Sequence, residues 1–125
     1  MSDDAPLSSK ESQNFFSLVY MLQRSALLHM GAIPDTEGMV HFNLGEAKEA
    51  IDLLDILAKR TSGNMDKIEE TMLKGIVSEL KMQFVRAPAD QAHFKKEQER
   101  QDELKQTFEK PEQATSDTLI DDDEE

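Results

Sequence analysis

The sequence has no cysteine and comparatively few basic residues, and both features limit what the protein can do. Without cysteine there are no disulfides, no catalytic thiols and no cysteine metal ligands. Lys and Arg number 14 against 26 Asp and Glu, which gives a net charge of −12. An acidic chain without a basic stripe repels phosphate backbones and anionic lipid surfaces. We therefore expect no nucleic-acid partner and no membrane partner.

Long apolar runs are also missing. The most apolar segment, residues 15–30, is interrupted by Gln23 and Arg24 and falls short of the roughly 18 apolar residues expected of a membrane span. The opening residues, MSDDAPLSSKE, lack the basic region of a signal peptide. Together with the absence of cysteine, this pattern predicts a cytoplasmic protein.

Capping signals and apolar periodicity predict an all-α fold with a three-helix core at about residues 12–30, 44–60 and 66–86. Ser8 with Glu11, or Ser12, can begin the first helix, and Gly31 suits the position just past its end. Asn43 is the expected N-cap of the second helix, with Glu46 three residues later.

The third helix is expected to begin at the N-cap Asp66, with Glu69 as its capping partner. Pro88 predicts that this helix ends at Val85 or Arg86. The preceding linker, TSGNM, is short enough to make the second and third helices antiparallel neighbours. We expect Gly63 or Asn64 to adopt the positive φ needed to leave the second helix.

The first helix is apolar on almost every side, which predicts self-association. One face is expected to pack in the bundle: Phe15, Leu18, Val19, Leu22 and Ala26. A second stripe, Phe16, Tyr20 and Leu27, is then left over. Because a domain of about sixty residues buries only about 60% of its surface, we expect this stripe to form a homodimer interface.

The charge is concentrated in the C-terminal part of the chain. Residues 1–88 hold 9 basic and 13 acidic residues, whereas residues 89–125 hold 5 and 13. Residues 89–110 carry a sparse apolar seam, Phe94, Gln101, Leu104 and Phe108, which is compatible with either an exposed fourth helix or a partly helical tail. We expect a helical domain over 12–88, and disorder in the lead-in 1–11 and the acidic tail 111–125.

Candidate catalytic and metal-binding residues are few. Asp52 and Asp55 share a helical face, but Lys48 and Lys59 stand four residues from them, so we interpret the group as a salt-bridged stripe. The three histidines, His29, His41 and His93, fall in different elements without metal-ligand spacing. No phosphate-binding or nucleophile motif occurs, so we assign no catalytic, cofactor or metal residue and expect no cofactor.

Several short motifs occur together in an order that resembles a known family. They are MGAIP at 30–34, NLGEA at 43–47, IDLL at 51–54 and TSGNM at 61–65, followed by Glu69. This combination, over roughly residues 13–86, resembles a small bacterial family known as domain of unknown function 1844. Met65 stands where the family pattern has leucine, and Asn43 where it has aspartate. The resemblance implies a cytosolic helical domain and supplies no catalytic residues.

Two functional hypotheses follow. The first is a non-enzymatic, self-associating interaction or adaptor domain, which could also bind another protein. The second is a small enzyme or ligand-binding protein whose site lies at a subunit interface. The enzyme hypothesis requires a pocket where two or more of five polar residues converge: His29, His41, Asp52, Asp55 and Thr61.

Overall fold

The computed structural model describes residues 9–109, which form three α-helices and, within that range, no strand. The helices are α1 (Lys10–His29), α2 (Leu44–Arg60) and α3 (Lys67–Glu109). The all-α, three-helix prediction is confirmed. Expectations for residues 1–8 and 110–125, including the acidic tail, lie outside the described residues.

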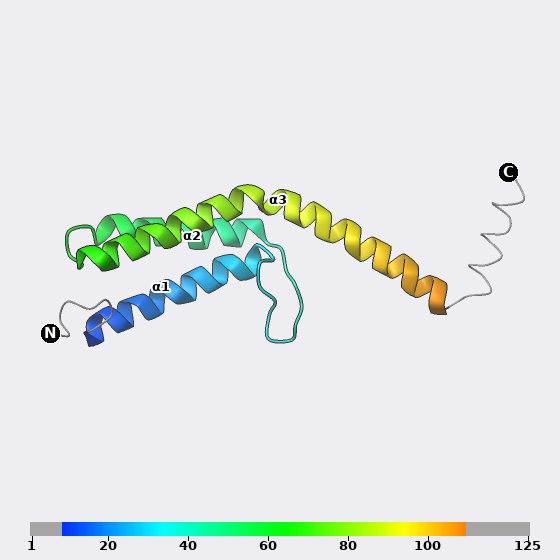
Figure 1. Cartoon of the computed structure of the whole chain (residues 1–125), viewed down its shortest axis with the longest axis horizontal. Helices are drawn as coiled ribbons and strands as arrows, with labels where there is room; N and C mark the ends of the chain where they lie inside the picture. Colours follow the sequence, from blue (N-terminus) through cyan, green and yellow to red (C-terminus); the bar gives the residue numbers. More distant parts are fainter. Residues whose placement is uncertain (1–8, 110–125) are drawn as a thin grey trace, which may run out of the picture. The chain divides into compact units, whose positions relative to one another are not determined.

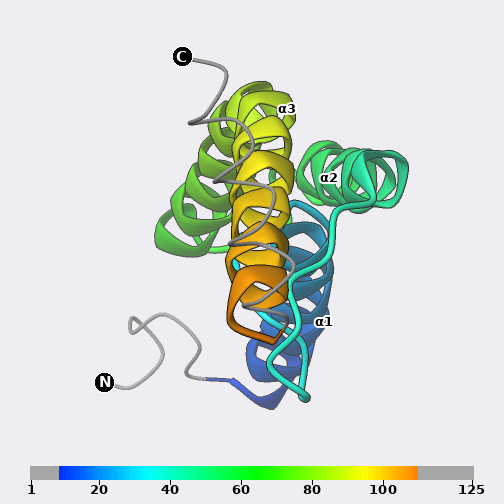
Figure 2. The same cartoon turned by 90° about the vertical axis from the view of Figure 1, so that its right-hand side faces the viewer.

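The chain divides into two units, residues 1–91 and 92–125, and α3 extends into both. In the first unit, α1, α2 and the first part of α3 lie side by side (Figure 1). The view along the helices in Figure 2 shows these three segments as neighbours around a shared centre. Their buried side chains form one core: Phe16, Val19, Ala26, Met30, Ala47, Ala50, Ile51, Leu54, Ala58, Leu73, Val77, Leu80 and Ala87.

The N-cap of the first helix lies one residue after the predicted cap Ser8 and three before the alternative Ser12, so Lys10 and Glu11 are helical and not part of a disordered lead-in. Ser9 is the N-cap, and its hydroxyl accepts a hydrogen bond from the amide of Ser12 at 3.0 Å. At the other end, the Ala32 amide donates to the Leu27 carbonyl at 2.9 Å, and Gly31 has φ +73°. These are the bonds of a Schellman motif, in which glycine supplies the left-handed residue.

The second helix begins at the predicted residue. The Asn43 side chain accepts from the Glu46 amide at 3.2 Å. The helix ends at Arg60, and the hydroxyl of the C-cap residue Thr61 donates to the Leu57 carbonyl at 2.7 Å. Ala47, Ala50 and Ala58 are buried along this helix, and such small side chains allow α1 and α2 to pack closely.

The predicted end of the third helix near Arg86 is wrong. Helix α3 continues through Pro88 to Glu109, so the residues expected to form a fourth helix or a tail are helical up to Glu109. Proline removes one helical amide donor and commonly breaks a helix. Here the residues after Pro88 are mainly Ala, Gln, Lys, Glu and Arg, which have high helix propensity and favour continuation.

Residues 92–109 of the second unit form a single charged helical segment. Arg100 pairs with Glu97, and Lys105 pairs with Glu109 at 3.9 Å. Leu104 and Phe108 are exposed, whereas Phe94 is half-buried. The sparse apolar seam is therefore largely open to solvent in this segment.

Candidate functional site

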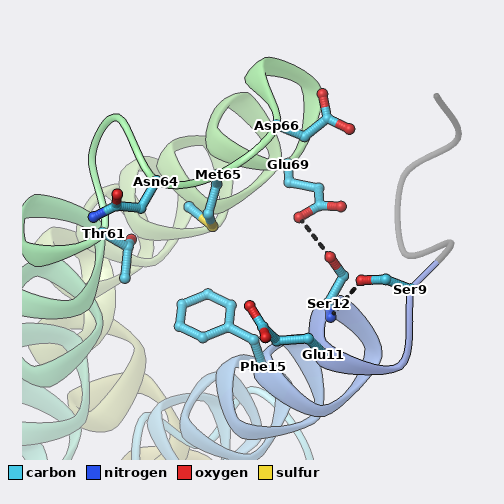
Figure 3. A pocket seen from close by; sticks show the side chains of 9 residues that line it. All are labelled: Ser9, Glu11, Ser12, Phe15, Thr61, Asn64, Met65, Asp66 and Glu69. Atoms are coloured by element: carbon cyan, nitrogen blue, oxygen red, sulfur yellow. Dashed lines mark hydrogen bonds between the residues drawn. The ribbon is translucent and has the colours of Figure 1, made fainter. Parts of the chain in front are cut away.

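A cavity of about 460 Å³ lies at one end of the first unit. It is bordered by the start of α1, the turn between α2 and α3, and the start of α3, and it opens to solvent (Figure 3). The lining residues are Ser9, Glu11, Ser12, Phe15, Thr61, Asn64, Met65, Asp66 and Glu69. Because this lining includes three carboxylates and no basic side chain, it attracts cations and repels anions.

Glu69 is the most deeply buried charged residue in the described chain, at 5% exposure. Its Oε2 atom accepts a hydrogen bond from the Ser12 hydroxyl at 3.1 Å, which joins α3 to α1 (Figure 3). A buried carboxylate needs such donors, and its place in the first turn of α3 also suits the positive end of the helix dipole. Ser12 and Glu69 therefore have a structural role in holding the two helix starts together.

The two aspartates of the salt-bridged stripe on α2 form ion pairs with lysines, as predicted. Lys48 bonds Asp52 at 2.8 Å, and Lys59 bonds Asp55 at 3.0 Å. Asp55 also bonds Lys81 of α3 at 3.3 Å. Lys59, and then Lys81, hold the pKa of Asp55 below its ordinary value. The stripe therefore links α2 to α3.

The histidines lie in separate local structures. The His29 Nδ1 atom is 2.7 Å from the Ser25 carbonyl in the last turn of α1. His41 lies in the α1–α2 loop, where its Nε2 atom is 2.6 Å from Asp35 Oδ2. His93 is exposed in the second unit. No group of three His, Cys, Asp or Glu side chains within residues 9–109 is arranged to hold a metal ion.

Asp35 organises the α1–α2 loop. Its Oδ1 atom accepts from the amides of Glu37 at 2.9 Å and Met39 at 2.8 Å. His41, followed by the Met39 amide, keeps the pKa of Asp35 below its ordinary value. These bonds fold the loop back on itself before the Asn43 amide reaches the His29 carbonyl at 2.8 Å.

The residues required by the enzyme hypothesis do not converge at the cavity. Of the five, only Thr61 lines it, and its hydroxyl is already bonded to the Leu57 carbonyl. Asp52 and Asp55 lie in the ion-paired stripe, and the two histidines lie in α1 and its following loop. The cavity was not predicted, because Ser12 and Glu69 stand 57 residues apart and each was read only as a local capping residue.

At the α2–α3 turn, Gly63 is the residue with positive φ, one of the two predicted for that role. The side chain of Glu69, the predicted capping partner of Asp66, bonds Ser12. Gly63 has φ +86°, and the Asn64 amide closes the turn on the Thr61 carbonyl at 2.9 Å. Asp66 immediately precedes α3, and its carbonyl accepts from the Glu70 amide at 2.9 Å. The Glu70 side chain secures the turn by accepting from the Ser62 hydroxyl at 3.3 Å. Lys74, with smaller contributions from the Gly63 amide and Ser62, lowers the pKa of Glu70.

The predicted self-association stripe is divided between core and surface. Phe16 is 1% exposed and packs in the core of the single chain, so its assignment to a dimer interface is wrong. Leu27 is half-buried, and Tyr20 is exposed with its ring 5.9 Å from that of Phe16. Leu18, predicted for the core, is instead exposed, as is Met21 at 68%. The buried arc of α1 is therefore centred between the two predicted stripes.

Comparison with known families gives one match. The family model described as a domain of unknown function, DUF1844, matches residues 12–86. The chain belongs to the DUF1844 family. The DUF1844 region covers α1 from residue 12, all of α2 and α3 up to residue 86, so it lies within the first unit. No curated protein and no solved structure gives a significant match.

The DUF1844 region also carries most of the exposed large apolar side chains. On its helices these are Leu18, Tyr20, Met21, Leu53, Ile56, Ile68, Met82 and Val85. None of the helices among residues 9–109 is both long enough and apolar enough to cross a membrane.

Proposed function

We propose that the protein is a non-enzymatic interaction domain that associates with itself as a homodimer. The observation that carries the proposal is the apolar surface left on α1 and α2 after the core is complete. Leu18 and Met21 are exposed on α1, and Leu53 and Ile56 are exposed on α2. These side chains would lose contact with water if a second molecule covered them, and self-association is a common way to cover such a surface.

An order-of-magnitude estimate indicates the strength of the association. Three of the four side chains are only about half exposed. Covering each side chain therefore yields roughly 1 kcal/mol, and eight of them in a dimer yield roughly 8 kcal/mol. Association itself costs about 4–15 kcal/mol in lost translational and rotational freedom. Since these terms are similar in size, the roughly 8 kcal/mol that a micromolar dimer requires has to come largely from shape and charge complementarity. We propose a dimer of that affinity.

The rival hypothesis of an enzyme or ligand-binding site has less support. Its five polar candidates lie in different places, and four of them do not line the cavity. The proposal also includes a cytoplasmic location, which agrees with the cysteine-free composition, and allows a further protein partner. The net charge of −12 disfavours nucleic acid as that partner.

Light scattering on the full chain tests the proposal. We expect a mass near twice 14.2 kDa at micromolar concentration. Met21→Glu should lower that mass because it places a charge in the apolar surface, whereas Val85→Glu, on α3, should leave it unchanged. Circular dichroism should show the same helix content for all three proteins. A wild-type chain that stays monomeric throughout this range contradicts the proposal.

A further inference from the structure

Four exposed apolar side chains of α1 and α2 lie on one side of the first unit, away from α3; they are Leu18, Met21, Leu53 and Ile56. Ser12 marks the α3 side of α1, because it bonds Glu69. At 100° per residue, Met21 lies about 180° from Ser12 around the helix, and Leu18 about 120°. Both side chains therefore point away from α3.

The same reasoning places the exposed residues of α2. Asp55 marks the α3 side of α2, because it bonds Lys81. Leu53 lies about 160° from Asp55, and Ile56 about 100°. Because α1 and α2 pack against each other, their outward surfaces form a continuous layer, which we call the α1–α2 face.

The α1–α2 face also includes one basic and one acidic side chain. Arg24 follows Met21 by three residues on α1, and Glu49 precedes Leu53 by four on α2. Both are exposed, and neither forms an ion pair within residues 9–109. The α1–α2 face is therefore defined by six residues: Leu18, Met21, Arg24, Glu49, Leu53 and Ile56.

The two helices present these residues at matching heights. The Asn43 amide bonds the His29 carbonyl, so the end of α1 and the start of α2 are level. At about 1.5 Å per residue, Arg24 lies roughly 8 Å from this end and Glu49 roughly 9 Å.

The apolar pairs continue this match along the two helices. By the same rise, Met21 and Leu53 lie at roughly 12 and 15 Å from the end, and Leu18 and Ile56 at roughly 17 and 20 Å. Starting from the end where α1 meets α2, the face of α1 therefore presents one cation followed by two apolar side chains. The face of α2 presents one anion followed by two apolar side chains.

On the basis of the proposed self-association, we infer that the α1–α2 face is the dimer interface and that the two-fold axis of the dimer runs parallel to the helices. This symmetry lays α1 of one copy on α2 of the other without changing the heights. Met21 then meets the partner's Leu53, and Leu18 meets the partner's Ile56. Arg24 meets the partner's Glu49, and the symmetry repeats each contact. Each α1 also runs antiparallel to the α2 that it contacts, which is a favourable dipole arrangement.

A two-fold axis across the helices gives a different charge pattern. It lays α1 on α1 and α2 on α2, with the ends exchanged. Glu49 would then lie near the partner's Arg60, an exposed cation at the far end of α2. Arg24 would then not face the partner's Glu49. The two arrangements therefore predict sensitivity to different arginines, and Arg60 provides a matched control.

Charge reversal in the full-length protein tests the inference. Arg24→Glu and Glu49→Arg each replace two attractive contacts in the homodimer by two repulsive ones. We expect each variant alone to raise the dimer dissociation constant roughly tenfold or more at low salt, with a smaller effect at high salt. Arg60→Glu should dimerise like the wild type. All of these substitutions are at exposed positions, so circular dichroism and melting should show a retained fold.

Mixing the two weakened variants gives the decisive result. An Arg24→Glu chain paired with a Glu49→Arg chain restores both opposite-charge contacts, so the mixture should form a heterodimer with near wild-type affinity. Native mass spectrometry identifies it, because the substitutions change the chain mass in opposite directions. The double variant Arg24→Glu with Glu49→Arg should also dimerise.

The outcomes separate this inference from the proposal on which it rests. If the wild type does not self-associate, both fail. If the wild type and both single variants dimerise equally and the mixture shows no preference, the dimer stands and the interface assignment is overturned. If Arg60→Glu weakens the dimer while Arg24→Glu does not, the proposed symmetry is overturned.

Discussion

Replacing Gly31 by alanine should destabilise the domain through two separate effects. Gly31 has φ +73°, a backbone conformation that costs an alanine roughly 1–2 kcal/mol. In addition, the new methyl carbon would lie 2.4 Å from Cζ of Phe42 and 2.7 Å from its two Cε atoms. Forcing this ring aside is an overpacking change that typically costs about 1–3 kcal/mol. The total loss is therefore about 2–5 kcal/mol, a large share of the 5–15 kcal/mol or so that stabilises an ordinary domain.

Gly38 provides the matched control in the same loop. It has φ +83°, but a methyl group there would meet nothing within 4 Å. Gly38→Ala should therefore lose only the backbone contribution of roughly 1–2 kcal/mol. Urea unfolding followed by circular dichroism, at one protein concentration because association also stabilises the fold, measures both variants.

A second background isolates the steric effect. In a Phe42→Ala protein, Gly31→Ala should lose no more free energy of unfolding than Gly38→Ala does in the wild type, because the ring is gone. Equal losses for Gly31→Ala and Gly38→Ala in the wild-type background would refute the close approach of Phe42 to Gly31.

Three further predictions concern the turn, the ion-paired stripe and the middle of α3. Gly63→Val should lose on the order of 1 kcal/mol or more in urea unfolding, because φ at this position is +86°; an unchanged unfolding midpoint would refute the role given to this glycine. Because the pKa of Asp55 in the folded protein lies below its ordinary value of 3.8, the ionised carboxylate stabilises the fold at every pH above 3.8. This stabilisation is lost as the pH falls from 3.8 through the lowered pKa. The melting temperature of Asp55→Asn should therefore fall less on acidification than that of the wild type, and an identical acid dependence would count against the Lys59 and Lys81 contacts. Gly75→Ala should raise the unfolding free energy by about 0.5–1 kcal/mol, since alanine is the better helix former and its methyl group would meet nothing within 4 Å; a loss would mean that another chain approaches there.

Local signals predicted the helices and their ends well where one residue controls the geometry. Asn43 caps α2, and Gly31 and Gly63 have positive φ at the two helix exits. These features depend on a few neighbouring residues and can be read from sequence. The cap of α1 was misplaced because Ser8, Ser9 and Ser12 all have the required hydroxyl, and the sequence does not choose among them.

Pro88 shows where a local rule fails. A proline after a helical pattern predicts an end, and α3 nevertheless continues. Ala87, directly before it, is buried in the core, so packing holds the helix in place up to the proline. The propensity of the following residues then favours further helical turns. The rule considers only the missing amide and omits both contributions.

The buried face of α1 could not be chosen from sequence. When almost every position of a helix is apolar, periodicity does not distinguish the side that packs from the side that remains free. The contacts of Ser12 with Glu69 and of α1 with α2 orient the helix, placing Phe16 inside and Leu18 outside. Such long-range contacts also form the cavity around Glu69. The surplus of apolar surface was predictable, but its position was not.

Sedimentation equilibrium on the unmodified full-length chain tests the central claim most directly. The mean mass should rise from near 14.2 kDa at the lowest concentration toward twice that value in the micromolar range, and it should then level off as a closed two-fold dimer requires. A mass that stays at 14.2 kDa throughout would contradict self-association, and a mass that rises without limit would contradict a closed dimer.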